Sequence, residues 1–305
     1  MDLIEKNLLK EIASLHEIPT GAYNIRKNGE SAGRNSTEHI QITQKTDKPG
    51  IDITIQPGTV NESVHIPVVL TQTGFQDTVY NDFFIGEGSD VTIVAGCGIH
   101  NSGCSVAQHD GIHTFHVGKF AKVRYVEKHY GEGEGEGKNV MNPETVVILD
   151  EGASLEMETT QIGGVDSTER KTTAKVGKDA TLIIREKIMT EGKQVAKTDF
   201  TVDLDGENSS TNVISRSVAK NCSHQVFLSR INGNNLCNGH TECDAIIMDQ
   251  ASVVAIPEVA ANDINASLIH EAAIGKIAGE QLIKLMTLGL SEEQAEEQII
   301  AGFLK

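Results

Sequence analysis

The chain has 305 residues, enough for one large domain or two ordinary ones. Its 43 acidic and 26 basic residues give a formal net charge of −17, which repels nucleic acid and anionic membrane surfaces, so neither is an expected partner. Because the sequence shows no secretion signal, no long apolar run and an odd cysteine count of five, we expect a cytoplasmic protein with free thiols.

The first residues predict a short amphipathic helix. In residues 3–15 apolar side chains recur at helical spacing between lysines and glutamates, at Ile4, Leu8, Leu9, Ile12 and Leu15. Pro19 and Gly21 then end the helical pattern. We therefore expect residues 1–36 to form an N-terminal helix and a linker.

Residues 37–264 predict a core of β-strands. A polar turn, a small residue and a strand recur along this region, with the small residue at Ser89, Ala121, Ala153, Ala180 and Ala251. The first four of these positions are nearly evenly spaced, and the longer gap before Ala251 could hold two or three further units. Such a steady period favours a parallel β-helix of stacked coils over the alternative, a β-sandwich of hairpins, because two-residue hairpin turns are few.

The glycine-rich segment 131–138 interrupts these strands. Three glutamates alternate with its glycines, so we interpret it as a mobile solvated loop, with contact to a partner as the alternative. Its spacing departs from that of a phosphate-binding loop. Any nucleotide hydrolysis is therefore expected in another chain.

Residues 265–305 predict two helices at the end of the chain. Gly289 is placed to end the first helix, and Ser291 with Gln294 forms a capping box for the second. Both helices carry an apolar face that either closes the end of the solenoid or binds a partner protein.

Potential metal ligands are concentrated in residues 237–244. Cys237 and Cys243 flank His240, and His270 with Glu271 follows further along the chain, so thiolate, imidazole and carboxylate could reach one metal centre. The alternative is that both cysteines only fill the core.

Six ordered blocks in residues 229–305 resemble the core domain of the SufB/SufD family. They are Ser229-Arg-Ile-Asn-Gly-Asn-Asn, His240-Thr-Glu-Cys243-Asp-Ala-Ile-Ile, Ile256-Pro-Glu, His270-Glu-Ala-Ala-Ile-Gly-Lys276-Ile-Ala-Gly-Glu280-Gln-Leu282, Gly289-Leu-Ser-Glu-Glu-Gln-Ala and Ile300-Ala-Gly-Phe303-Leu-Lys. A thinner likeness upstream, at Gly96-Cys97 and in residues 118–125, extends the resemblance over most of residues 85–305.

The resemblance implies a right-handed parallel β-helix with helical ends. It also implies a non-catalytic scaffold for a transient iron-sulfur cluster, working with a SufC-like ABC ATPase, a sulfur donor and acceptor proteins. The ATPase would dock on the terminal helices through Leu282, Leu285, Met286, Ile299 and Phe303. The chain resembles a short member without the long N-terminal region, so we expect a homodimer through the C-terminal part of the β-helix.

The same resemblance implies roles for particular residues. Cys243 aligns with a family cysteine and is the expected main thiolate, while Glu271 with His270 or His240 would complete a labile site at a dimer interface. Ile269 replaces the first acidic residue of the family's acidic-histidine-acidic step, which removes one carboxylate. Cys237 and Cys222 have no assigned counterpart in the family, and we propose them as further thiolates only because clusters prefer sulfur ligands.

Cys97 and Cys104 lie in a histidine-rich region that could relay sulfur as a persulfide or hold a second metal. The nearby imidazoles are His100, His109, His113 and His116, and the alternative is that they stand on water-exposed strand faces. Relay would require Cys97 to be a thiolate near neutral pH, which a histidinium could favour.

Two other functions remain open on the sequence alone. One is a SufD-like structural partner that binds no cluster. The other is a β-helix enzyme acting on polysaccharide, which the free thiols and the absent secretion signal disfavour.

Overall fold

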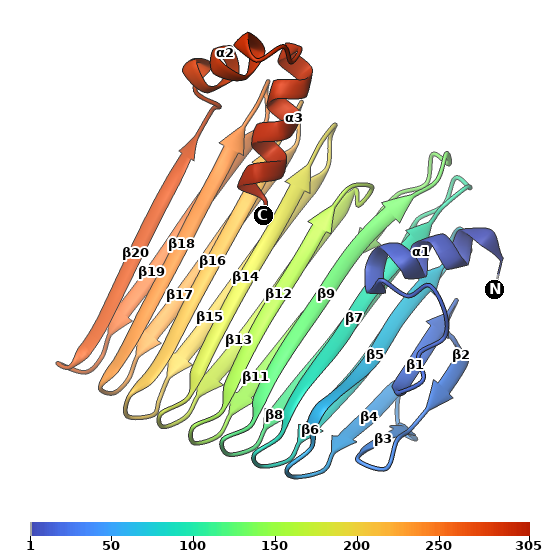
Figure 1. Cartoon of the computed structure of the whole chain (residues 1–305), viewed down its shortest axis with the longest axis vertical. Coiled ribbons are helices and arrows are strands. Elements are labelled where there is room, and N and C mark those ends of the chain that lie inside the picture. Colours follow the sequence, from blue (N-terminus) through green and yellow to red (C-terminus); the bar gives the residue numbers. More distant parts are fainter. Residues whose placement is uncertain (1) are drawn as a thin grey trace.

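The computed structural model describes residues 2–305, and its strands form two facing sheets of a flattened solenoid (Figure 1). In spatial order the first sheet contains β2 (Glu30–Asn35), β1 (Ala22–Lys27), β5 (Val60–Leu70), β7 (Asp90–His100), β9 (Lys122–Glu132), β12 (Ser154–Ile162), β14 (Thr181–Thr190), β16 (Ser209–Ala219), β18 (Cys237–Ile247) and β20 (Ala266–Gly275). The second contains β19 (Ser252–Ala261), β17 (His224–Gly233), β15 (Val195–Leu204), β13 (Ser167–Val176), β10 (Asn139–Met141), β8 (Ala107–Val117), β6 (Gln76–Ile85), β4 (Gly50–Ile55) and β3 (Ile40–Gln44), and β11 (Glu144–Leu149) pairs with β13 and β8 beside β10.

Each coil contributes one strand to each sheet, in parallel register with the coil before it. Lys122 pairs with Asp90 on one side and with Ser154 on the other, and Ser154 pairs in turn with Thr181. Each of these residues directly follows one of the repeated small residues, so the predicted parallel β-helix is confirmed. Ala180 precedes β14 in the first sheet, whereas Ala251 precedes β19 in the second sheet. The longer gap between these two small residues therefore spans two and a half coils.

Alternation along each strand builds the core between the sheets. In β9, for example, Val123 and Tyr125 are buried, and Arg124 between them faces outward. Because the register is parallel, like residues stack from coil to coil, as Phe83 does on Phe115 with ring centroids 4.4 Å apart. Inward positions of successive coils therefore form continuous rows, which matters for the polar residues described below.

The N-terminal end begins with helix α1 (Leu3–Ala13), as predicted. Its apolar side packs Leu8, Leu9 and Ile12 against Ile25 and Val69 on the outer face of the first sheet. The interpretation of residues 22–36 as a linker is wrong, because β1 and β2 occupy them and form an antiparallel pair at this end of the sheet.

The C-terminal end carries helices α2 (Gly279–Thr287) and α3 (Glu292–Phe303), and the predicted capping box between Ser291 and Gln294 is present. The segment 265–305 is not wholly helical, because β20 fills its first part. Ile300 and Leu304 pack on Val218 at the outer face of the first sheet, so α3 lies along that face, whereas α2 buries none of its residues (Figure 1). In the described part of the chain they leave β19 and β20 largely exposed, and the interpretation that they close the solenoid is wrong.

Within residues 2–305, no helix combines the length and the apolar character needed to cross a lipid bilayer.

Candidate metal centre

Strand β18 separates the predicted ligands onto two faces. Cys237 and Cys243 are buried and point between the sheets, whereas His240 lies on the outer face. Side chains three residues apart in a strand point to opposite faces, so Cys243 and His240 cannot reach one ion from the same side of the sheet. We call Cys237, Cys243 and His270 the inner set, and His240, Glu242 and Glu271 the outer set.

The inner set consists of thiols that are protonated in the folded chain, together with one imidazole. Burial, together with the carboxylates of Glu186 and Asp244, raises the pKa of Cys243 to about 12, and burial also raises the pKa of Cys237. Bound metal replaces the thiol proton, so Cys243 becomes a thiolate when a metal arrives.

His270 lies on the inner face beside Thr241, its register partner on β18. Its Nδ1 atom is buried without a hydrogen-bond partner among the described residues, although buried polar atoms are normally paired. Burial is the main cause that lowers the pKa of His270, which favours the neutral imidazole that binds metals. An unpaired nitrogen in this place suits a ligand that arrives from outside the chain.

The outer set brings three donors together. One ligand atom from each of His240, Glu242 and Glu271 lies within 4.8 Å of the others. Asn212 Oδ1 lies 3.0 Å from His240 Nδ1, so this ring nitrogen donates its proton there and Nε2 stays free to bind, 3.4 Å from Glu271 Oε2. Glu242 was not predicted as a ligand, although it lies two residues after His240 and therefore on the same face of the strand.

The two sets differ in the metals that they suit. The outer set offers nitrogen and oxygen, ligands that accept a divalent ion such as Fe²⁺, whereas the inner set offers the sulfur preferred by clusters. Among residues 2–305 the outer set is the only group of three such donors within 4.8 Å, so the inner set does not by itself bring three ligand atoms together.

Cys222 belongs to neither set. It is exposed in the turn between β16 and β17, whereas Cys237 begins β18 after the opposite turn. A strand of ten residues is roughly 33 Å long, so the two cysteines lie at opposite edges of the sheets.

The histidine-rich region is divided between the interior and the outer face. His109 and His113 are buried between the sheets, so their interpretation as water-exposed is wrong, while His116 stacks outside on Phe84. Burial lowers the pKa of His113 to about 4, and burial with the Asp77 and Glu127 carboxylates raises the pKa of Cys97 far above its usual value. His113 therefore supplies no positive charge that would favour the Cys97 thiolate on which sulfur relay through Cys97 depends.

A row of polar side chains runs through the interior from this region. Asn81 Nδ2 lies 3.2 Å from His113 Nε2, and His113 Nδ1 lies 2.8 Å from Tyr125 Oη. Tyr125 donates to Glu127 Oε1 over 2.9 Å, and Arg170 Nη1 donates to Glu127 Oε2 over 2.6 Å. Because Tyr125 donates to the carboxylate, its oxygen accepts the Nδ1 proton of a neutral His113.

The row continues toward Cys243. Arg170 Nε lies 3.7 Å from Glu186 Oε1, and Ser215 donates to Glu186 Oε2 over 2.9 Å. Ser215 is the register partner of Cys243 on the next strand. At the other end Cys97 is the register partner of His129, whose Nδ1 lies 3.3 Å from Arg170 Nη2. We call this chain from Cys97 through Arg170 to Cys243 the interior row.

The interior row escaped sequence analysis. Glu127, His129, Arg170 and Glu186 occupy inward positions of strands that otherwise alternate regularly. Charged residues at these inward positions could have revealed the interior row. However, which positions face inward is known only once the strand register is known.

The glycine-rich segment is ordered, contrary to its interpretation as a mobile loop. The backbone nitrogens of Gly135 and Gly137 donate to the carbonyls of Asn101 and Gly103 in the turn of the preceding coil. Gly133 has φ of +120°, and a Cβ there would collide with the Asn101 backbone, so this stacking requires glycine. Cys104 lies exposed in that same turn.

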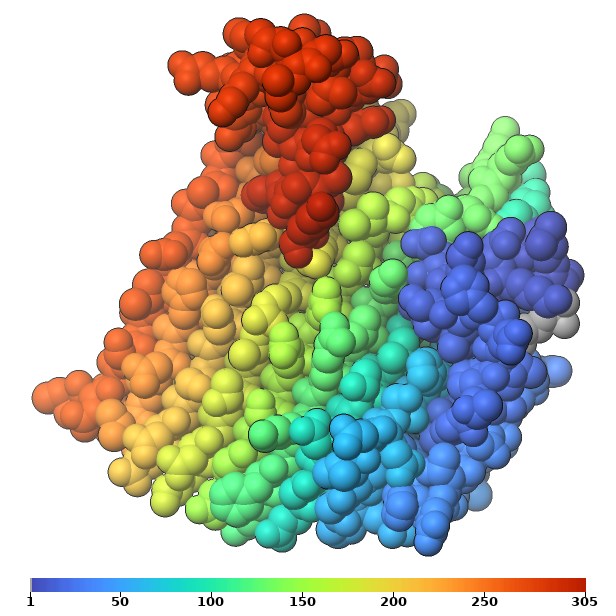
Figure 2. Space-filling model, in the orientation of Figure 1, coloured from blue at the N-terminus to red at the C-terminus, as the bar shows by residue number. Residues whose placement is uncertain are grey.

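Helix α2 presents an apolar surface to solvent. Ile283 and Met286 are 63% and 42% exposed, and the helix projects from the body of the molecule (Figure 2). Leu282, Leu285, Ile299 and Phe303, the other predicted docking residues, are partly buried.

Comparison with known proteins agrees with the resemblance. Residues 73–303 match the family described as SUF system FeS cluster assembly, SufBD core domain. The chain is 30% identical over 276 residues to an iron-sulfur cluster assembly SufBD family protein of Archaeoglobus fulgidus, covering 89% of this chain and 72% of that protein. A protein of the same description from Methanocaldococcus jannaschii is 30% identical over 246 residues, which is 79% of this chain and 76% of the relative. The chain therefore belongs to the SufBD family of iron-sulfur cluster assembly proteins.

Proposed function

We propose that the chain is a scaffold on which an iron-sulfur cluster forms before transfer to an acceptor protein. The observation that carries this proposal is the buried thiol of Cys243 on the same inner face as His270, whose buried Nδ1 has no hydrogen-bond partner among the described residues, on the two last strands of the first sheet. A cluster that must leave is held by few ligands, and Cys243 with His270 supplies few from one chain. The outer set would hold incoming ferrous iron, and Glu271 and His240 would serve in that step. The scaffold itself would catalyse nothing.

Anaerobic reconstitution with iron and sulfide tests this function, with the absorption spectrum and the iron-to-sulfide ratio as readouts. We expect a coloured, stoichiometric cluster, alone or with the ATPase bound. The alternative, a SufD-like structural partner, predicts no cluster under either condition while the protein remains folded.

The second copy of the chain would complete the site at the open end. β19 and β20 each have ten residues and one unpaired edge, and apolar side chains such as Val259 are exposed there although they point between the sheets. Edges of this length pair readily with another chain. A two-fold pairing would bring two inner sets toward each other, so that each copy contributes a Cys243.

Changing Val259 to aspartate should convert the dimer to a monomer, because it places a charge at the centre of the proposed interface. Light scattering after size exclusion measures the mass, and the unchanged protein should elute at twice its 32.8 kDa. Val195→Asp is the matched control, since Val195 is 42% exposed against 47% for Val259 but lies away from the open end. A dimeric Val259→Asp protein, or a monomeric unchanged protein, would rule out this interface.

The ATPase would bind the apolar surface of α2. Replacing Ile283 and Met286 together by glutamate should abolish co-purification with the ATPase, because both side chains are free to be buried by a partner. Leu3→Glu on α1, where Leu3 is 73% exposed, is the control. Deletion of residues 279–305 should have the same effect, but it also uncovers Val218, so the double substitution is the sharper test. Binding retained by the double variant would refute docking on α2.

Sulfur would enter at Cys104, which is exposed and can meet a donor protein. Cys97 is buried as a thiol at the start of the interior row, so we assign the entry of sulfur to Cys104 alone. Exposed free thiols at Cys104 and Cys222 fit a reducing cytoplasm.

A further inference from the structure

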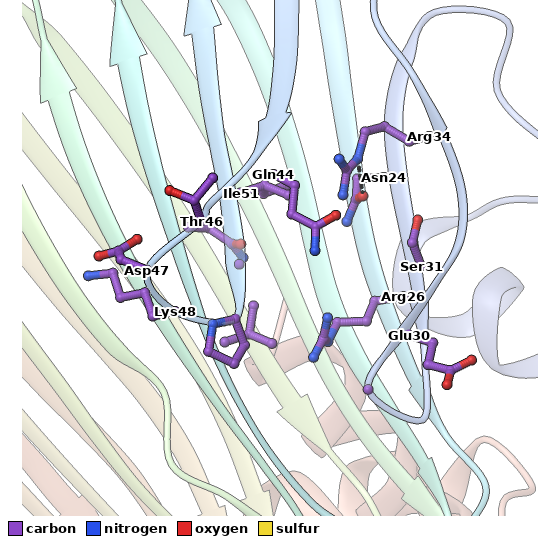
Figure 3. A pocket seen from close by; sticks show the side chains of 15 residues that line it. Asn24, Arg26, Glu30, Ser31, Arg34, Gln44, Thr46, Asp47, Lys48 and Ile51 are labelled. Atoms are coloured by element: carbon purple, nitrogen blue, oxygen red, sulfur yellow. Dashed lines mark hydrogen bonds between the residues drawn. The ribbon is translucent and has the colours of Figure 1, made fainter.

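The N-terminal end of the solenoid contains a polar cavity that the cluster site does not use. The cavity has a volume of about 610 Å³, within the usual range for small-molecule sites. Strands β1 and β2 form one wall and the turn between β3 and β4 forms the other (Figure 3). Val79 and Asn81 of β6 also line the cavity. Most of its residues precede residue 73, where the match to the SufBD core begins.

Two arginines in this cavity are held in place by neighbours. Arg26 binds Asp77 in a bidentate pair, with Nε to Oδ2 at 2.8 Å and Nη2 to Oδ1 at 2.7 Å. Arg34 donates from Nε to Asn24 Oδ1 over 2.8 Å. Among the described residues the terminal nitrogens of Arg34 have no hydrogen-bond partner, and no carboxylate forms an ion pair with it. A positioned guanidinium with a free donor pair is the arrangement that binds carboxylates and phosphates.

The acidic residues of the lining do not neutralise this arginine. In Figure 3 the carboxylates of Glu30 and Asp47 point away from the space between Arg26 and Arg34. Lys48 adds a further positive charge at the rim, 4.5 Å from the Tyr80 ring centre. Asp77 neutralises Arg26, so Arg34 and Lys48 are the cations of the lining left without an ion-pair partner among the described residues, and Arg34 is the one held in place to receive an anion.

We propose that this cavity binds a small organic or inorganic anion through a carboxylate or phosphate group held by Arg34 and Arg26. The buried amides of Asn24 and Asn81 would bind its polar remainder. Asn81 also contacts His113, so the bound anion would lie at the end of the hydrogen-bonded chain that leads to Glu127. The proposal does not depend on the cluster function, because its residues lie at the opposite end of the solenoid.

Isothermal titration calorimetry at constant ionic strength tests the site, with inorganic phosphate and citrate as separate probes. We expect one of them to bind saturably with one equivalent per chain, and Arg34→Gln to weaken binding at least tenfold because it removes the charge-assisted pair. Phosphate binding alone would assign a phosphate ligand, and citrate binding alone a carboxylate ligand.

Arg124→Gln is the matched control, because Arg124 is an exposed arginine on the outer face of the first sheet and pairs with Glu158. It should leave the affinity unchanged, and the thermal midpoints of both variants should match the unchanged protein. The proposal is overturned when neither anion binds saturably, or when both arginine variants lower the affinity equally.

Discussion

Replacing Cys243 by alanine should abolish the reconstituted cluster while the chain stays folded. Cys243 is the proposed main cluster ligand of the inner set, and the removed sulfur lies between sheets that many other side chains hold together. The loss of one buried sulfur should cost about 1 kcal/mol of stability, far less than the whole fold contributes. Iron and sulfide content and the visible absorption measure the cluster, and circular dichroism checks the fold.

Cys222→Ala is the control for this prediction, because Cys222 is exposed in a turn that belongs to neither ligand set. It should retain the cluster. Equal cluster content in the Cys243→Ala and Cys222→Ala proteins would contradict the assignment of Cys243. A parallel measurement on Glu271→Gln separates the two sets, since an iron-capture role predicts slower loading rather than a missing cluster.

Replacing Arg170 by methionine should lower the free energy of unfolding by about 3–5 kcal/mol. Arg170 is buried between Glu127 and Glu186, and its removal leaves both carboxylates without a cation in the core. Burial opposes the ionisation of Glu127, yet the Arg170 guanidinium holds its pKa well below the usual value, and burial lowers the pKa of the neighbouring His129. Urea denaturation followed by circular dichroism measures the change.

Arg185→Met is the control, because Arg185 forms its ion pair with Glu156 on the exposed outer face. An exposed pair contributes roughly 0–1 kcal/mol, so the urea midpoint should move little. A double variant, Arg170→Met with Glu127→Gln, should recover part of the lost stability, since it removes one of the two unpaired charges. If the Arg170 and Arg185 variants lost equal stability, the interior row would not be an energetically linked group.

Much of the fold was predictable because it repeats. Each coil places a small residue such as Ala121 or Ala153 at the same turn, and the period appears directly in the sequence. The strands β1, β2 and β20 were missed because they lie outside that repeated turn, where neighbouring coils and not local pattern decide the conformation.

The site was only partly predictable, because ligands close in sequence can face apart. Cys243 and His240 are three residues from each other, and only strand register shows that they lie on opposite faces. Glu242 joins His240 for the same reason, and Arg170 joins Glu127 across neighbouring coils although the two are distant in sequence. Spacing along the chain identifies candidate donors, whereas the parallel stacking decides which of them meet.

The two ends of the solenoid are unequal, and this difference limits how far the protein can polymerise. At the N-terminal end the outermost strands β2 and β3 have only six and five residues, and β2 carries Glu30 and Arg34. Short charged edge strands disfavour pairing with a strand of another chain, whereas the ten-residue edges of β19 and β20 favour such pairing. In the proposed dimer each copy covers the β19 and β20 edges of the other, so strand addition at this end would stop with one partner.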